Sequence, residues 1–281
     1  MPTLQQPSMT PPPEVALLPT LRRVPIAAPW RWLRAGWSDL TGTGFKGLLY
    51  GAFFALMGWL LATMYVDYWK LTIGLTTGFF LLGPFLCCGL YWLSRQRERG
   101  ERVSFADSLT CWRSNPKSIG FFGIVLAFLL MIWARISAVV FALFATHEYP
   151  TLQGMMAQVF SRTNMDFMLA WFAVGFVFAA VAFAISVVSM PMMLDRGTDP
   201  VIATLTSMAV VANNVLPMLL WAALIVVLIG TSLVLGYVGL VVTAPLVGHA
   251  TWHAYRELVG EAPAAAGSTT STATGALPRS R

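Results

Sequence analysis

Two histidines near the end of the chain have a spacing that could bind a metal ion. His249 and His253 are four residues apart, so on a helix their side chains share one face. Two imidazoles at that spacing can contribute to a metal site or supply a haem ligand. The sequence offers no third suitable ligand nearby, and histidine at the end of a span also suits the negative end of the helix dipole. We therefore favour polar packing residues and expect no cofactor, with a metal site at His249 and His253 as the alternative.

Arg135 is the one charged residue inside a long apolar run, residues 119–145. A charge within a membrane span is costly enough to be a candidate functional group by default. On a helix that begins at Ile119, Arg135 lies about 24 Å along the axis, near the far end of the span. There its guanidinium can reach the interface or pair with a carboxylate of a neighbouring span. The candidate partners are Asp67, Glu148 and Asp166. We favour such pairing, and an anion-binding or proton-pathway role is the alternative.

Pro191, Asp195, Arg196 and Arg256 mark the ends of two apolar runs. Pro191 can end or kink its helix, and Asp195 beside Arg196 indicates the return of the chain to water. Neither run end carries a catalytic motif, and no segment outside the apolar runs is long enough to bury the core of a soluble catalytic domain. No catalytic residue is therefore assigned, and we do not expect an enzyme.

The elements that must position these residues are membrane helices. From Pro200 to Tyr255 the chain runs for 56 residues without one Lys, Arg, Asp or Glu. Soluble helices and strands need a charged face toward water, so this stretch cannot be the core of a small soluble domain. Of the 281 residues 57% are apolar and only 11% charged, against roughly a quarter in ordinary soluble domains. The sequence therefore places the protein in a lipid bilayer.

Apolar runs of about 20 residues are long enough to cross the hydrocarbon core. The run from Val215 to Gly248 has 34 residues and would be about 51 Å long as one helix, so we break it near 230–236. One long bent helix is the alternative, with five spans in all. The six expected spans are 47–66, 71–93, 119–145, 167–193, 215–232 and 236–255. The predicted fold class is all-α, a polytopic transmembrane helix bundle.

The expected domain organisation is one membrane domain, residues 30–259, between two disordered tails. Residues 1–29 are rich in proline, and residues 260–281 are rich in Ala, Ser, Thr and Gly. Such segments cannot bury enough apolar surface to offset the entropy lost on ordering. Inside the domain, small residues four apart predict close helix packing. These pairs are Gly51 with Ala55, Gly74 with Gly78, and Gly175 with Ala179.

The basic residues predict the orientation of the spans. All but three of the 18 Lys and Arg residues fall on one side of the six-span layout. The exceptions are Lys70, Arg135 and Arg162. By the positive-inside rule both termini are expected in the cytoplasm. The net charge of +6 is thus explained by membrane topology, and no nucleic-acid partner is expected.

Three short amphipathic segments precede successive pairs of spans and predict helices that lie in the membrane interface. Each has apolar residues at positions i, i+4 and i+7. The three sets are Leu33, Trp37 and Leu40; Phe105, Leu109 and Trp112; and Val201, Leu205 and Met208. This layout predicts three repeats, each an interfacial helix followed by a transmembrane hairpin, although the match between the three is loose.

Several segments resemble a bacterial family of predicted integral membrane proteins, domain of unknown function 2189. They are residues 105–109, 183–191, 194–196 and 248–256, within a resemblance that covers roughly 30–259. The resemblance implies a bacterial inner membrane and transfers no activity. Some family members carry a cytochrome c oxidase subunit label, but a haem–copper core needs more histidine ligands than the three in this chain. At most the label would fit an accessory subunit.

The sequence is compatible with three functions. The favoured one is a non-catalytic membrane protein, such as a scaffold, assembly or envelope factor. The second is a transporter or channel-like protein for small solutes, for which Arg135 and the repeated layout are the motivation. The third is a haem- or metal-binding accessory protein of a respiratory oxidase, which would use His249 and His253. The expected partners are the lipid bilayer and either other membrane proteins or further copies of the chain.

Overall fold

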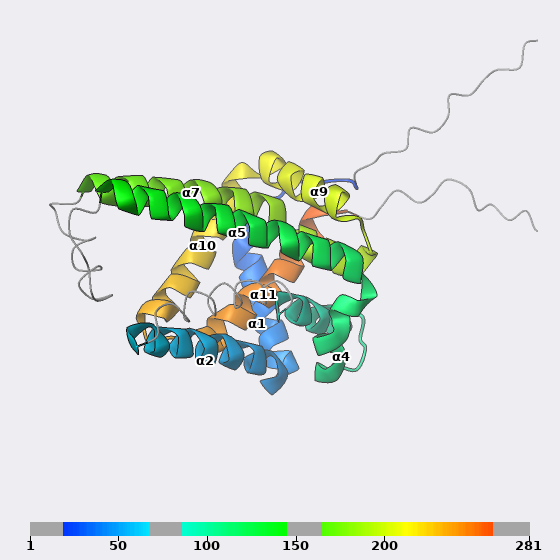
Figure 1. Cartoon of the computed structure of the whole chain (residues 1–281). Helices are drawn as coiled ribbons and strands as arrows, with labels where there is room; N and C mark the ends of the chain where they lie inside the picture. The colour runs from blue at the N-terminus through cyan, green and yellow to red at the C-terminus, as the bar shows by residue number, and fades with distance from the viewer. Residues whose placement is uncertain (1–18, 68–85, 145–164, 261–281) are drawn as a thin grey trace, which may run out of the picture.

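Four long apolar helices form a large part of the described structure. A computed structural model describes residues 19–67, 86–144 and 165–260. Within these ranges the long helices are α2 (Phe45–Asp67), α5 (Pro116–Phe144), α7 (Met165–Ser186) and α10 (Val215–Val234). In Figure 1 α5 and α7 run side by side along one edge of the bundle and α2 along the opposite edge. Shorter helices, including α1, fill the space between these edges.

Shorter helices complete the described structure. They are α1 (Ala28–Thr43), α4 (Phe105–Thr110), the 3-10 turn η1 (Cys111–Ser114), α8 (Ser189–Arg196), α9 (Pro200–Asn213) and α11 (Leu240–Leu258). Residues 86–98 are also helical. Apart from an isolated bridge between Leu21 and Val259, the regular structure of the described ranges is helical. The predicted fold class, an all-α membrane bundle, is confirmed.

The long helices turn apolar side chains outward. Four described stretches have the length and composition to cross a membrane: Phe45–Met64, Pro116–Val140, Met165–Arg196 and Val215–Val234. Large side chains on them, such as Phe176 and Val226, are 69% exposed. A soluble protein rarely leaves so much apolar surface in water, and lipid is the solvent that makes it favourable. Most of the predicted span 71–93 lies outside the described residues, as does most of the two predicted tails.

The last apolar run forms two helices rather than one. Helix α10 ends at Val234, and after a turn at residues 235–239 the chain enters α11. The turn holds two residues with positive φ, Gly236 at 77° and Tyr237 at 70°. This left-handed backbone cannot continue a helix, so the run divides into two helices as predicted, and the alternative of one long bent helix is wrong.

Helix α11 crosses both α1 and α2 at glycines. A Cβ built on Gly36 of α1 would lie 2.7 Å from the backbone nitrogen of Ala250. A Cβ built on Gly51 of α2 would lie 2.0 Å from the carbonyl oxygen of Val241. The backbones therefore approach more closely than any other residue would allow. Gly51 packs as its small-residue pattern predicts, whereas a Cβ on Gly175 would meet open space.

Helices stand where the three amphipathic segments were predicted, but their outward faces differ from one another. On α9 the predicted apolar stripe, Val201, Leu205 and Met208, is exposed throughout. On α1 the stripe divides, because Trp37 is 52% exposed while Leu40 is only 5% exposed. Leu40 therefore faces the interior of the protein, whereas Trp37 faces outward. The buried face of α1 packs on α11, and this contact draws Leu40 inward with Trp32, Gly36 and Thr43.

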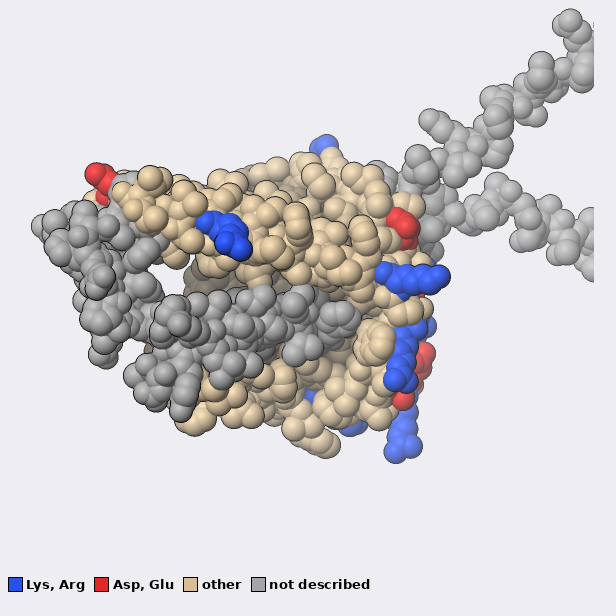
Figure 2. All heavy atoms as spheres, viewed as in Figure 1, with Lys and Arg blue, Asp and Glu red and all other residues tan. Residues whose placement is uncertain are grey.

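The described ends of the chain meet on one side of the bundle. Arg22 N donates to the Leu258 carbonyl at 2.9 Å, and Gly260 N donates to the Thr20 carbonyl at 2.8 Å. Figure 1 shows the blue and red ends of the ribbon lying together. Figure 2 shows most of the visible charged side chains at the same end of the molecule (right), beside a nearly uncharged surface over the long helices. We call this region the charged end.

Candidate functional site: a network of ion pairs at the charged end

Four segments meet at the charged end, where their charged side chains form ion pairs with one another. These segments are α1, residues 86–98, α8 and α11. The local sequence explains how α8 is held there. Gly197, with φ of 64°, ends α8 in the left-handed conformation that favours glycine. The Asp199 side chain then accepts from Val201 N at 2.8 Å and Pro200 opens α9, so the chain turns sharply just after Asp195 and Arg196.

Asp195 is the centre of the network. Its side chain is 7% exposed and its Oδ1 pairs with Arg95 Nε at 3.2 Å and Arg99 Nη2 at 3.3 Å. Its Oδ2 accepts from the Tyr255 hydroxyl at 3.0 Å and lies 3.5 Å from Arg256 Nη1. A buried carboxylate is stable only when paired and hydrogen bonded, and three arginines and a hydroxyl provide that here. Asp195 thus joins α8 to residues 86–98 and to α11.

Arg196 links α8 to the residues at the C-terminal end of α11. Its Nε donates to the Tyr255 hydroxyl at 2.7 Å. Its Nη2 donates to the carbonyls of Val259 at 3.1 Å and Gly260 at 2.7 Å. The last carbonyls of a helix lack partners within the helix, and a cation there also complements the helix dipole. The neighbours Asp195 and Arg196 therefore both hold Tyr255 in place.

Asp39 forms a second centre, on α1. Its side chain is 8% exposed, with Oδ1 3.1 Å from Arg97 Nε and Oδ2 2.8 Å from His253 Nε2. The pKa of Asp39 is lowered from its ordinary value of 3.8. Burial would raise this pKa, but the hydrogen bonds of His253 and Ser94 and the nearby positive charge outweigh the effect of burial. Asp39 thus joins α1 to residues 86–98 and to α11.

Two glutamates complete the network. Glu98 accepts from Arg256 Nε at 2.9 Å and from the Trp252 indole nitrogen at 2.8 Å. Glu257 of α11 pairs with Arg31 and accepts from the Trp32 indole nitrogen at 2.8 Å, both on α1. Glu98 is more exposed than the two aspartates, and exposed pairs contribute little to stability. The glutamates therefore orient the side chains around the two buried aspartates.

The predicted histidine pair divides between different partners. His249 is fully buried, and its Nδ1 lies 2.7 Å from Ser94 Oγ. His253 contacts Asp39 instead, although both histidines are on α11. Among the described residues no group of three or more His, Cys, Asp or Glu side chains is arranged to hold a metal ion. The metal site at these two histidines stays a prediction.

His249 Nε2 is buried without a hydrogen-bond partner in the described structure. A Cβ built on Gly47 would lie 3.1 Å from this nitrogen and 3.0 Å from Thr43 Oγ1. Even one added methyl group at Gly47 would be closer to Nε2 than an ordinary van der Waals contact, so Gly47 packs tightly beside this nitrogen. A porphyrin ring does not fit between His249 and these residues of α1 and α2.

Arg135 and Pro191 lie away from this network. Arg135 is exposed on α5, and no described carboxylate pairs with it. Of its predicted partners Glu148 lies outside the described residues, as does the side chain of Asp67. Pro191 stands in the first turn of α8, where its missing N–H leaves no helical hydrogen bond unmade. The helix breaks before this proline, at the turn of residues 187–188.

Sequence reasoning recovered only part of this site. The sequence marked Asp195, Arg196 and Arg256 as the ends of apolar runs. In the structure Asp195 and Arg196 both hydrogen bond to the Tyr255 hydroxyl, and Arg256 lies beside Asp195. Asp39 and Glu98 were missed. A usable signal was present, because Asp39 stands on the inward face of an amphipathic helix, where a carboxylate needs a partner.

Long helices with outward apolar side chains, fastened at one end by ion pairs, define an integral membrane protein with several helical spans. A comparison with protein families indicates the same class of protein. Residues 71–195 match the model of the family described as "Predicted integral membrane protein (DUF2189)". The family resemblance expected from the sequence is thus confirmed over residues 71–195. No match was found among the curated proteins or among the solved structures.

Lowering the pH should weaken the contribution of Asp39. Because the folded-state pKa of Asp39 lies below its unfolded value, this group stabilises the fold above about pH 4, and the effect is lost as the pH falls through the folded-state pKa. We expect Asp39→Asn to lower the free energy of unfolding by about 1–2 kcal/mol at pH 7, and by less at pH 3. Thermal unfolding in detergent at both pH values measures this.

The matched control for this prediction is Asp107→Asn. Asp107 is an exposed carboxylate on α4 and forms none of the ion pairs of the described structure. The control should show little change at either pH. A destabilisation by Asp39→Asn that is the same at pH 3 and pH 7 would contradict the assignment.

Proposed function

We propose that this chain is a non-catalytic membrane scaffold, an assembly or envelope factor that presents its charged end to a protein partner. The observation that carries the proposal is that two buried carboxylates, Asp195 and Asp39, hold the helices of the charged end together. Each of these carboxylates joins three of the four segments. A fixed arrangement of helices is what a scaffold needs in order to hold a partner in one geometry.

The same network argues against a transporter. Alternating access requires helices at each end of a bundle to separate in turn. Separating α11 from α8 would leave Asp195 without Arg256, and separating it from α1 would leave Asp39 without His253. A buried charge that loses its partner costs several kcal/mol. The position of Arg135, exposed on α5, also gives it no place on an internal pathway.

The proposed orientation places the charged end in the cytoplasm of a bacterium, with the protein in the inner membrane. Two observations support this orientation. The two described chain ends pair with each other on one side, and the arginines of residues 95–99 lie within the same network. The positive-inside rule then assigns that side to the cytoplasm.

Photo-crosslinking in living cells tests the proposed function. A photoreactive amino acid is placed at Arg34 or Arg102, which are exposed and take no part in the network. The control position is Val226, which is exposed on the apolar α10. We expect both Arg34 and Arg102 to give an adduct with the same protein, and Val226 to give no adduct with that protein.

Two results would count against the scaffold. One is the absence of any protein adduct from Arg34 and Arg102, although the labelled chain is present in the membrane. The other is flux of a solute through proteoliposomes that depends on the purified chain and is lost on Arg135→Ala. An adduct of twice the mass of the 30.7 kDa chain would identify a second copy as the partner.

A further inference from the structure

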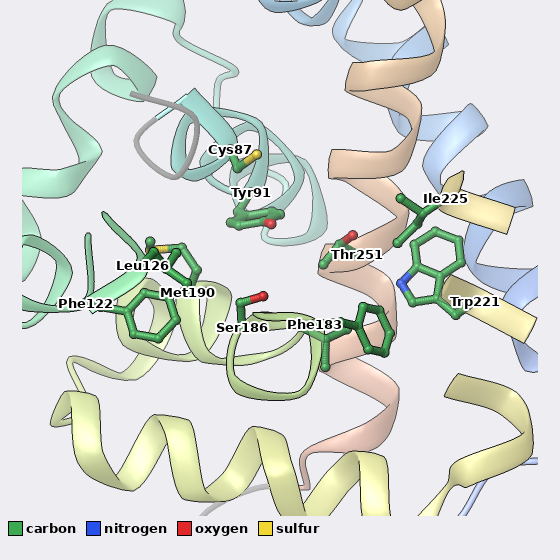
Figure 3. A pocket seen from close by; sticks show the side chains of 11 residues that line it. Cys87, Tyr91, Phe122, Leu126, Phe183, Ser186, Met190, Trp221, Ile225 and Thr251 are labelled. Carbon is green, nitrogen blue, oxygen red and sulfur yellow. The ribbon is translucent and has the colours of Figure 1, made fainter. Parts of the chain in front are cut away.

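A cavity of about 240 Å³ lies where residues 86–98 meet α5, α7, α8, α10 and α11 (Figure 3). Most of its wall is apolar, with Phe122 and Leu126 from α5, Phe183 from α7, and Ile225 from α10. It is separate from the ion-pair network, since none of the network's charged side chains lines it. Buried ligand sites have this composition, an apolar wall with few polar groups.

One polar atom in the wall lacks a partner. The Trp221 side chain is fully buried, and its indole nitrogen makes no hydrogen bond within the described structure. The ring is held edge-on against Trp32, with ring centroids 5.7 Å apart at 89°. In Figure 3 the nitrogen lies on the side of the ring toward Thr251 and Phe183. An unpaired buried N–H costs about 1–3 kcal/mol, so the cavity is expected to supply an acceptor.

The other polar groups of the wall are suited to accept hydrogen bonds. Ser186 Oγ donates its hydrogen to the Ala182 carbonyl at 2.6 Å, and Thr251 Oγ1 donates its hydrogen to the Val247 carbonyl at 2.7 Å. Both oxygens keep lone pairs that can accept. Figure 3 shows the hydroxyls of Tyr91 and Ser186 directed toward the same space. The wall therefore presents an unpaired donor at Trp221 and acceptors at Ser186 and Thr251.

We propose that this cavity binds a small apolar molecule that carries one hydroxyl group. A hydroxyl oxygen accepts from the Trp221 N–H, and its hydrogen is donated to Ser186 or Thr251. The volume sets the size of the molecule, because an engineered apolar cavity of roughly 150 Å³ holds one benzene ring. A single ring with a short substituent therefore fills 240 Å³. A phenolic compound dissolved in the bilayer has this chemistry, and so does the hydroxyl-bearing end of a lipid.

Fluorine NMR on the full chain in lipid nanodiscs tests the proposal with two matched probes. The probe 4-fluorophenol carries the hydroxyl, and fluorobenzene is its counterpart without oxygen. Trp221→Phe keeps an aromatic ring in the wall and removes the donor; it also removes part of the ring surface, an effect that both probes report equally. This variant should weaken 4-fluorophenol binding about 2- to 10-fold and leave fluorobenzene binding nearly unchanged. Trp37→Phe, at an exposed tryptophan of α1, is the control and should change neither.

A second pair of variants fills the cavity. Leu126→Trp should abolish binding of both probes, and Ser186→Leu serves the same purpose if the first variant does not fold. Equal affinity of wild type and Trp221→Phe for 4-fluorophenol would overturn the assignment of the donor. Probe signals identical to those of empty nanodiscs would show a cavity that holds water alone, and would overturn the proposal.

Mass spectrometry of the purified protein distinguishes the two sources of the ligand. A hydroxyl-bearing lipid that remains bound to the wild type and is lost from Leu126→Trp identifies the lipid source. Retention of a small phenolic compound under the same conditions identifies the free molecule. The scaffold proposal does not depend on either result, because crosslinking at Arg34 and Arg102 tests it separately.

Discussion

Replacing Asp195 by asparagine is expected to lower the free energy of unfolding by about 3 kcal/mol. The substitution keeps the size of the side chain and removes its charge. Arg95, whose side chain is 17% exposed, would lose its carboxylate, while Arg99 and Arg256 are closer to water and lose less. Most of the expected cost therefore comes from one buried guanidinium left without its counter-charge.

Thermal unfolding in detergent, with the folded fraction read from the circular dichroism signal, measures this effect. The matched control is Asp199→Asn, the same substitution four residues further along. Asp199 is exposed and caps α9 through its side-chain oxygen, a role that asparagine performs equally well. If the two variants melt within a degree of each other, Asp195 is not the centre of the network.

Replacing Gly51 by alanine is expected to cost about 1–3 kcal/mol, through the crossing of α2 and α11. The added methyl carbon would lie 2.0 Å from the carbonyl oxygen of Val241, well inside van der Waals contact. A flexible side chain could move away, but this neighbour is helix backbone. The two helices would therefore have to separate, and the fit of α11 against α1 at Gly36 would be strained with them.

Gly175→Ala is the control for this prediction. Gly175 lies on α7, and a Cβ there has no neighbour within 4 Å. The substitution should be neutral or slightly stabilising, because alanine favours the helix over glycine by roughly 0.5–1 kcal/mol. Unfolding of the two variants in the same detergent compares them directly. A loss of stability in both variants alike would show that the Gly51 contact is not the cause.

Both predictions concern α11, the helix that connects the parts of the protein. Its first half crosses α2 at Gly51, its middle crosses α1 at Gly36, and its last turns carry His253, Tyr255 and Arg256 into the network. Helix α11 is not among the four described stretches apolar enough to cross a membrane by length and composition. Its polar second half is used for contacts inside the protein rather than with lipid.

Hydropathy and segment length are enough to predict that the protein lies in lipid and where its long helices run. The long uncharged runs require lipid, and α2, α5, α7 and α10 stand where such runs occur. The amphipathic segments also appear as helices, including α1 and α9. These features can be predicted because hydropathy and helical periodicity are local properties of the chain. Leu40 shows the limit of such local patterns, because its burial depends on the packing of α1 against α11.

Which charges and polar groups meet depends on how the helices pack in three dimensions. Asp39 pairs with His253 from 214 residues away, and Trp252 finds Glu98 from 154 residues away. The positive-inside rule counts arginines on a side and assigns them no partners. Partners depend on where helix backbones cross, and the crossings at Gly36 and Gly51 are set by side chains of several helices at once. For the same reason the cavity beside Trp221, formed by six separate segments, has no signature in the sequence.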